Sequence, residues 1–134
     1  MPLFAECGGF LYLQNMMEDT KGNRYKMADV LPGSSHMEKK LIRFGYIKLT
    51  AKCDTLLLKK GASILGHEFH YADTTDNGDA LYAEKPNGRN WCSVQQKGSV
   101  MAGFPHMYFP SNKNAAQRFV ESMAEYQKRR KQFK

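Results

Sequence analysis

The residue whose surroundings most suggest chemistry is a cysteine close to the first residue of the sequence. Cys7 lies in the run Leu3-Phe4-Ala5-Glu6-Cys7-Gly8-Gly9, where a short apolar segment meets a turn of small residues. A nucleophile held on a sharp strand-to-helix turn adopts an unfavourable backbone conformation. The chain around it packs closely, so the residues two positions before and two positions after the nucleophile must be small. Ala5 and Gly9 meet that need. The spacing predicts a nucleophile at Cys7, and a buried structural cysteine is the alternative.

The residue after Cys7 bears on its chemistry in two ways. If a helix starts at Gly8 or Gly9, Cys7 lies at its positive end, where free amides and the helix dipole favour thiolate over thiol. The thiolate is the form that attacks a carbonyl carbon. The backbone N–H of Gly8 is a natural oxyanion donor, because it directly follows the nucleophile.

A cysteine nucleophile generally needs a histidine that the fold brings near it. Of the four histidines, His106 is the best placed, because it follows a predicted strand over 99–102 and lies in a loop bounded by glycine and proline. The alternative is a surface histidine in a connection. His36 is predicted to be a solvated loop residue.

The segment His67-Glu68-Phe69-His70 invites a metal interpretation, which its spacing does not support. The two histidines are three residues apart on a predicted strand, so their side chains point to opposite faces. This is not the helical zinc motif, and we expect no metal site. Glu68 and His70 share a face, either as a hydrogen-bonded polar pair or as residues of a pocket.

These residues are positioned by an α/β chain with more strand than helix, which we expect to form one unit over 1–134. Helical spacing of apolar residues predicts a helix over 8–17 and another over 114–128, with a cap at Ser111-Asn112. Residues 3–6 are predicted to form a short strand. Further strands are predicted between strong turn signals, at 41–50, 55–58, 63–72, 80–84, 92–96 and 99–102.

Composition excludes several classes of protein. Hydrophobic residues make up 42% of the 134 residues, enough for a packed core. The net charge is +7, but five basic residues lie in 128–134, and the rest of the chain has 15 basic against 13 acidic residues. We therefore expect no nucleic-acid partner, because basic residues also suit the C-terminal end of a helix. No apolar stretch predicts a membrane span, and three irregularly spaced cysteines favour the cytoplasm.

Five segments along the chain form a recognisable succession: Phe4 to Leu13 (FAECGGFLYL), Leu31 to Gly33 (LPG), Arg43 to Tyr46 (RFGY), Gly66 to Tyr71 (GHEFHY) and Gly98 to Asn112 (GSVMAGFPHMYFPSN). This succession resembles the glutamine amidotransferase domain of the cobyrinic acid a,c-diamide synthase family, a CobB/CobQ-type class I glutamine amidotransferase. Relatives in that family include nickel-sirohydrochlorin a,c-diamide synthase and, more distantly, cobyric acid synthase.

The resemblance implies a partial class I glutamine amidotransferase fold, a flavodoxin-like three-layer α/β domain with a strand-rich middle. It implies that Cys7 attacks the side-chain amide of glutamine and releases ammonia, while His106 acts as base and then acid. In the complete enzymes a separate N-terminal domain uses ATP and Mg to activate the a and c carboxylates of a tetrapyrrole in cobalamin biosynthesis. This chain itself is expected to hold no cofactor.

The sequence also departs from the family. The glycines of Gly61 to Gly66 have phosphate-loop spacing without the lysine and hydroxyl. Tyr108, a further candidate for the pocket, stands where the family often has histidine, so the third catalytic partner is unassigned. Gly103 replaces the usual serine. We expect a domain truncated before Cys7, without the ATP-binding half and with weak or no activity alone.

Three alternatives remain open. The chain is a catalytically incomplete fragment, a docking subunit of a split synthase, or a relative of the nickel-sirohydrochlorin enzyme. An exposed sheet edge at the first strand would favour self-association or pairing with a complementing synthetase chain.

Overall fold

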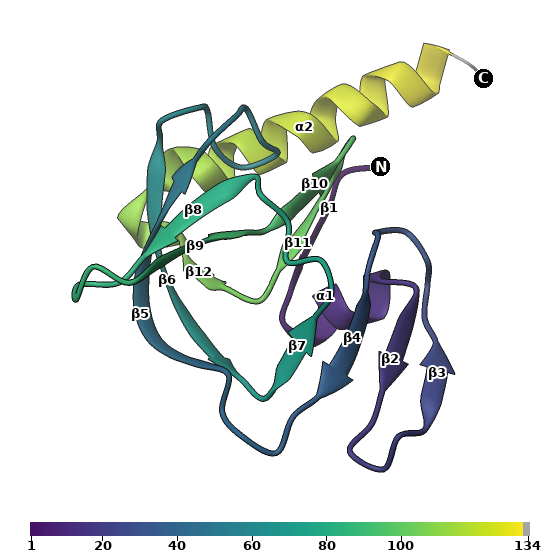
Figure 1. Ribbon diagram of the computed structural model, residues 1–134. Coiled ribbons are helices and arrows are strands. Elements are labelled where there is room, and N and C mark those ends of the chain that lie inside the picture. The colour runs from purple at the N-terminus through teal and green to yellow at the C-terminus, as the bar shows by residue number, and fades with distance from the viewer. Residues whose placement is uncertain (133–134) are drawn as a thin grey trace.

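The computed structural model describes residues 1–132, which form three β-sheets with a short helix near the N-terminus and a long one at the C-terminus (Figure 1). Phe133 and Lys134, the end of the basic tail, lie outside the described residues. In chain order the elements are β1 (Leu3–Glu6), α1 (Gly8–Leu13), β2 (Met16–Glu18), β3 (Arg24–Lys26), β4 (Ser34–Met37), β5 (Arg43–Ala51), β6 (Ser63–His70), β7 (Ala72–Thr74), β8 (Leu81–Glu84), β9 (Asn90–Ser93), β10 (Gln95–Lys97), β11 (Val100–Gly103), β12 (His106–Tyr108), the 3-10 turn η1 (Phe109–Ser111) and α2 (Lys113–Gln132).

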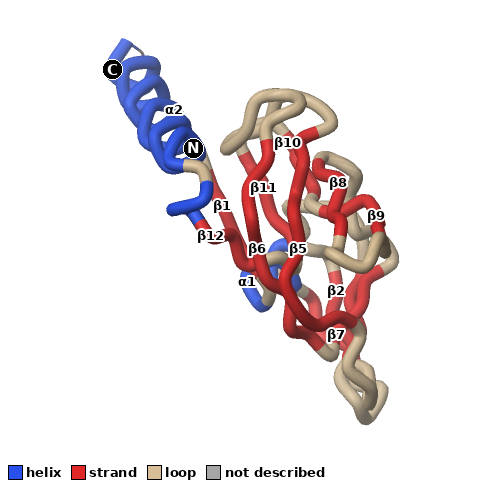
Figure 2. The backbone as a smooth tube through the Cα atoms, turned by 90° about the vertical axis from the view of Figure 1, so that its left-hand side faces the viewer, coloured by secondary structure: helices blue, strands red, loops and turns tan. Residues whose placement is uncertain are grey.

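The strands pair across long sequence distances. The first sheet has the order β1-β11-β10, and β1 runs parallel to β11 with Glu6 opposite Gly103. The second is antiparallel with the order β12-β6-β5-β8-β9, and the third has the order β3-β2-β4-β7. The second sheet curves beside the first in both views (Figures 1 and 2). The mixed α/β class predicted from the sequence is confirmed.

Two hydrophobic cores lie on opposite sides of β1. Alternating residues of β5 and β6, such as Leu49 and Ile64, point inward and form the larger core. The smaller core surrounds α1 and includes an edge-to-face contact between Phe10 and Phe104, with ring centroids 5.3 Å apart. Phe4 of β1 packs against the larger core, whereas its neighbours pack against the smaller one. This alternation anchors the strand that leads to Cys7.

The helix predicted over 8–17 is shorter than expected. α1 ends at Leu13, and the next residues form β2, which pairs with β3 and β4. The buried Gln14 is extended at the helix end, and its side-chain amide donates to Thr74 Oγ1 at 2.6 Å. Tertiary pairing of the following residues therefore overrides the helical spacing.

Two predicted strands are also corrected. The run 55–58 is a turn, because Thr55 Oγ1 accepts the Leu58 N–H at 2.9 Å and also donates to the Leu58 carbonyl. The run 92–96 is divided between β9 and β10 at Val94, whose φ is 71°. That φ is unfavourable for a β-branched residue. At this point Gly78 packs against the Val94 backbone so closely that a side chain at residue 78 would collide with the Val94 carbonyl group.

Other predictions agree with the structure or need only new boundaries. Strands form close to the residues predicted for β1, β5, β6, β8 and β11. α2 is longer than predicted, and Asn112 caps it, accepting the Asn114 N–H through Oδ1 at 3.2 Å. The residue pattern did not predict β2, β3, β4 or β12, and the single strand predicted over 63–72 is divided into β6 and β7, which belong to different sheets. His36 therefore lies in a strand rather than a loop, with Nε2 3.3 Å from Glu38 Oε1.

Candidate active site

Cys7 lies at a strained junction between β1 and α1. Its φ is 48° and its ψ is −108°, values that few residues other than glycine adopt. A Cβ added at Gly9 would lie 3.1 Å from the Ala5 Cβ, whereas a Cβ added at Gly8 would meet no atom within 4 Å. The predicted elbow and its need for small residues are therefore confirmed.

The thiol of Cys7 is not activated in the way that the sequence suggested. Burial is the main cause that raises the pKa of this thiol, and the charges of Glu6 and Glu68 raise it further. The nearby N–H of Gly8 favours the thiolate, as expected at a helix start, but its effect is smaller than that of burial. Because α1 has only six residues, its dipole is weak. The resting side chain is a thiol and needs a base.

Backbone amides at the start of α1 are available near the cysteine. The Leu11 N–H is the first to bond back to the helix, donating to the Cys7 carbonyl at 3.1 Å. The amides of Gly8 and Gly9 come before this bond, so they have no acceptor within the helix. The Cys7 N–H itself donates to the Gly103 carbonyl at 2.8 Å and ties the turn to β11. Gly8 remains the predicted oxyanion donor.

His106 begins β12 instead of lying in a loop, and it stands opposite His67 of β6. About half of its side chain is exposed, at 48%. Its Nδ1 lies 3.2 Å from Oε2 of Glu6, the residue that precedes Cys7. The fold therefore brings the predicted base to the end of the strand that carries the predicted nucleophile, across 100 residues of sequence.

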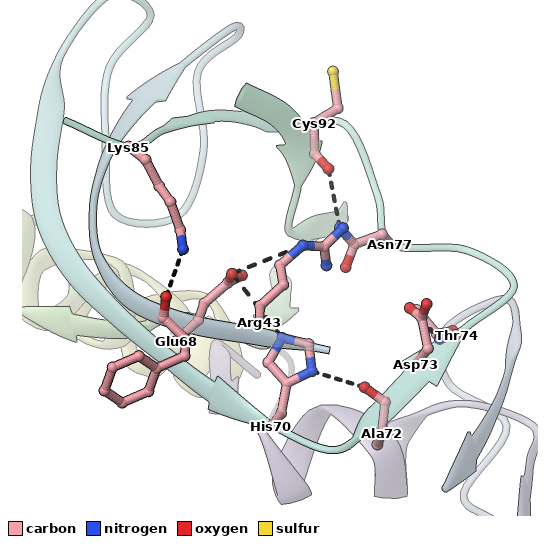
Figure 3. A network of polar contacts seen from close by, with 10 residues as sticks. Arg43, Glu68, His70, Ala72, Asp73, Thr74, Asn77, Lys85 and Cys92 are labelled. Carbon is pink, nitrogen blue, oxygen red and sulfur yellow. Dashed lines mark hydrogen bonds and ion pairs between the residues drawn. The ribbon is translucent and has the colours of Figure 1, made fainter. Parts of the chain in front are cut away.

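Glu68 and His70 are buried on the same face of β6, as the strand alternation predicted (Figure 3). Glu68 Oε2 lies 4.0 Å from His70 Nε2 and 3.9 Å from Arg43 Nε. These separations exceed hydrogen-bonding distance, and among the described residues neither Glu68 oxygen nor His70 Nε2 has a hydrogen-bond partner. The expectation that Glu68 and His70 form a hydrogen-bonded pair is therefore wrong, although the two residues do share a face. A pocket role for the two residues stays a prediction.

The surroundings of this cluster determine its protonation. Burial raises the pKa of Glu68 to about 7, against the opposing charges of Arg43 and Lys85. Burial also lowers the pKa of His70, whose ring stacks on Phe104 with centroids 3.8 Å apart. His70 Nδ1 lies 2.7 Å from the Ala72 carbonyl, so this nitrogen carries the proton and Nε2 is an acceptor.

Arg43 is held in place by an aromatic ring. Its guanidinium carbon lies 4.8 Å from the centroid of the Trp91 ring, a cation–π distance. In Figure 3 the side chain extends from β5 toward the Glu68 carboxylate. Arg43, Glu68 and His70 thus form a buried cluster of a cation, a carboxylate and an imidazole in the second sheet. The charge of Glu68 also raises the pKa of Cys7.

Two family departures have structural consequences. Tyr108 lies two residues after His106 on β12, and its side chain is exposed, at 59%. It makes no side-chain hydrogen bond within the described part of the chain. At Gly103, an added Cβ would lie 2.8 Å from Val94 Cγ2, so the serine that the resemblance leads us to expect there would require Val94 to shift. Gly103, which has no side chain, therefore accommodates Val94 and its positive φ.

Sequence reasoning missed Glu6 as part of the site. The only signal was its position, a carboxylate at the end of a strand and next to the nucleophile. Within residues 1–132, no group of three or more His, Cys, Asp or Glu side chains is arranged to hold a metal ion. No helix in the same range is long and apolar enough to cross a membrane.

Comparison with known proteins places this geometry in a family. The chain is 37% identical over 123 residues to the cobyrinate a,c-diamide synthase of Salmonella typhimurium, covering 88% of this chain and 27% of that protein. It is 37% identical over 122 residues to the enzyme of the same name from Picrophilus torridus, covering 90% and 26%, and 35% identical over 130 residues to that of Caldanaerobacter subterraneus, covering 94% and 28%. The chain thus spans about a quarter of the length of these relatives. Residues 1–114, which include the Cys7 turn and His106, match the model of the CobB/CobQ-like glutamine amidotransferase domain, and the chain belongs to that family.

Proposed function

We propose that this chain is the glutamine-hydrolysing part of a cobyrinate a,c-diamide synthase, with Cys7 as nucleophile and His106 as base. The observation that carries the proposal is the strained turn at Cys7, between β1 and α1, in a domain of this family. Such strain persists only where the surrounding structure imposes it, and it is concentrated at functional sites. The contact between His106 and the residue before Cys7 supports the pairing of the two.

The proposed chemistry proceeds in two steps. His106 takes the thiol proton of Cys7 as the sulfur attacks the side-chain carbonyl carbon of glutamine, and the Gly8 N–H stabilises the resulting oxyanion. The C–N bond then breaks, the imidazolium returns its proton to the leaving nitrogen, and ammonia departs from a glutamyl thioester. Water, deprotonated by the same histidine, hydrolyses the thioester to glutamate and restores the thiol.

The rest of the synthase reaction is proposed from the relatives, whose name identifies cobyrinate as their substrate. Ammonia would be used by an ATP- and Mg-dependent part that amidates the a and c carboxylates of a tetrapyrrole. Gly61 and Gly66 do not form a phosphate loop in this chain, because Gly66 lies within β6. A nickel-sirohydrochlorin-type substrate is the alternative. All three cysteines are free, which supports a cytoplasmic reaction.

A partner strand at the free edge of β1 is also part of the proposal. Among the described residues β1 pairs only with β11, so its other edge presents unpaired backbone groups. The partner would be a complementing synthetase chain or a second copy of this one.

Alkylation by a chloroketone analogue of glutamine tests the glutaminase proposal. The thiolate displaces chloride from the reagent, and mass spectrometry locates the thioether. We expect labelling of Cys7 in preference to Cys53 and Cys92, competition by glutamine, and a rate at least about 100-fold lower in His106→Ala. His36→Ala is the matched control, because His36 also contacts a glutamate but lies in the third sheet. Equal labelling of all three cysteines would contradict the proposal.

A further inference from the structure

Glu6 contacts the first two residues of β12 through both oxygens of its carboxylate. Oε2 lies 3.2 Å from His106 Nδ1, and Oε1 accepts the backbone N–H of Met107 at 2.8 Å. One carboxylate therefore fixes both the imidazole of residue 106 and the main chain that follows it. The Glu6 side chain is largely shielded, at 27% exposed, while that of His106 is at 48%.

The alternation of β1 explains why Glu6 reaches this place. Phe4 and Glu6 point to the same face of the strand, because side chains two apart share a face. Phe4 packs edge-to-face against Phe109, with centroids 6.0 Å apart, and Glu6 contacts the residues just before it. This face of β1 thus meets the segment 106–109 at two successive points. The fold, rather than a local turn, determines which ring nitrogen of His106 faces a carboxylate.

A carboxylate at Nδ1 has a defined effect on a histidine. An ionised carboxylate only accepts hydrogen bonds, so it retains the proton on Nδ1 and leaves the Nε2 lone pair free. Nε2 is then the nitrogen that can accept a proton from a thiol. The same carboxylate stabilises the imidazolium that forms after the transfer, as the third member of a catalytic triad does.

We propose that Glu6 is the positioning residue of His106, supplying from the nucleophile's own strand the third partner that position 108 does not supply. This inference rests on the proposed glutaminase function. Glu6 acts through His106 and does not touch the substrate. Glu6 and Cys7 are adjacent at the end of β1, so the carboxylate that contacts His106 is fixed to the same turn as the nucleophile.

The contrasting interpretation is that Glu6 only joins β1 to β12. A purely structural tie would tolerate Glu6→Gln, because the carbonyl oxygen of the new side-chain amide can still accept the Met107 N–H. The amide nitrogen would then face Nδ1 and donate to it. His106 would adopt the Nε2–H tautomer, which cannot accept the thiol proton at that nitrogen. Glu6→Gln therefore separates the two roles with one substitution of equal size.

Two measurements on the full chain test the proposal. Nitrogen-15 NMR of the imidazole rings reports which nitrogen of the neutral His106 ring carries the proton. We expect Nδ1–H in the wild-type protein and Nε2–H in Glu6→Gln. We also expect the chloroketone to label Cys7 at least about 10-fold more slowly in Glu6→Gln, with little change in the fold seen by NMR. Glu38→Gln, which changes the contact between Glu38 and His36 in another part of the fold, should alter neither the His106 tautomer nor the labelling rate.

The outcomes distinguish this inference from the function on which it rests. Selective, His106-dependent labelling of Cys7 that is unchanged in Glu6→Gln would overturn the role of Glu6 and leave the glutaminase proposal in place. Loss of selectivity in the wild-type protein would contradict the glutaminase proposal itself. If Glu6→Gln does not fold, the wild-type spectrum still decides, because a predominant Nε2–H tautomer of His106 is incompatible with a positioning carboxylate at Nδ1.

Discussion

Glu68 Oε2 and His70 Nε2 face each other 4.0 Å apart in the protein interior, and neither atom has a hydrogen-bond partner among the described residues. Arg43 approaches the same carboxylate from β5, and Lys85 acts on it from beyond the end of β8. The cluster is close enough to the site for the charge of Glu68 to act on Cys7. A buried polar cluster without direct hydrogen bonds makes protonation at Glu68 important for stability.

We predict that wild-type stability includes a component from Glu68 that declines between pH 4.5 and 7. The pKa of Glu68 is raised from 4.5 to about 7, so in this range the folded chain binds more protons than the unfolded chain. Stability from this group is complete below pH 4.5 and is lost as the pH rises through 7, a change of about 3 kcal/mol. Glu68→Gln removes the titration, so the variant should gain stability relative to wild type across that range.

Urea unfolding at several pH values measures this difference. The difference between variant and wild type isolates Glu68, because the lowered pKa of His70 contributes with the opposite sign and remains in both proteins. Glu84→Gln, on the exposed side of β8, is the control and should follow the wild-type profile. A constant difference between Glu68→Gln and wild type from pH 4.5 to 8 would refute the assignment.

Cys7 should react slowly with a small reagent that has no affinity for a glutamine site. Burial raises the pKa of its thiol, so little thiolate is present near pH 8, whereas Cys53 and Cys92 are exposed. Iodoacetamide should therefore modify Cys53 and Cys92 before Cys7, the reverse of the order expected with the chloroketone. Mass spectrometry after timed quenching measures all three rates. Faster iodoacetamide reaction at Cys7 than at the exposed cysteines would show that its thiol is activated in the resting state.

The close approach of Gly9 to Ala5 predicts a difference between two adjacent glycines. Gly8→Ala adds a methyl group into open space and should be neutral or stabilising by up to about 1 kcal/mol, because alanine favours the helix. Gly9→Ala places its Cβ 3.1 Å from the Ala5 Cβ. This close contact should cancel the gain in helix propensity and disturb the Cys7 turn. Thermal unfolding measures both. The double variant Ala5→Gly with Gly9→Ala should recover stability, and no recovery would mean that another contact limits Gly9.

The free edge of β1 predicts association that depends on backbone hydrogen bonds. The amides of Leu3 and Cys7 donate to residues 99 and 103, so the N–H of Phe4 points to the open edge. We expect sedimentation velocity to detect dimers as the concentration rises. N-methylation of Phe4, introduced by ligating a synthetic 1–6 peptide at Cys7, should abolish dimers without unfolding the chain.

The ligation experiment contains its own control. N-methylation of Leu3 blocks an amide that already donates to the Ser99 carbonyl at 2.9 Å, so it should lower stability instead. A chain that remains monomeric at high concentration with the unmodified edge would rule out self-association, and a complementing chain would then be the remaining partner.

The sequence by itself predicted the features that local chemistry determines. The apolar run before Cys7 and the small residues around it predicted the strand, the sharp turn and the start of α1. Alternation along 63–70 predicted that Glu68 and His70 share a face. The cap at Asn112 predicted the start of α2. Each of these depends on residues within about four positions of one another, so a pattern in the chain is sufficient to find it.

Only the tertiary structure decided the rest, because those features depend on contacts between distant segments. α1 ends early because β2 pairs with β3 and β4, and the Cys7 thiol is a weak acid because the surrounding fold buries it. The carboxylate of Glu6 meets His106 because β1 runs parallel to β11, which brings residues 100 apart into contact. No spacing rule links a strand-end glutamate to a histidine so far along the chain, and the packing of β1 between its two cores supplies that link.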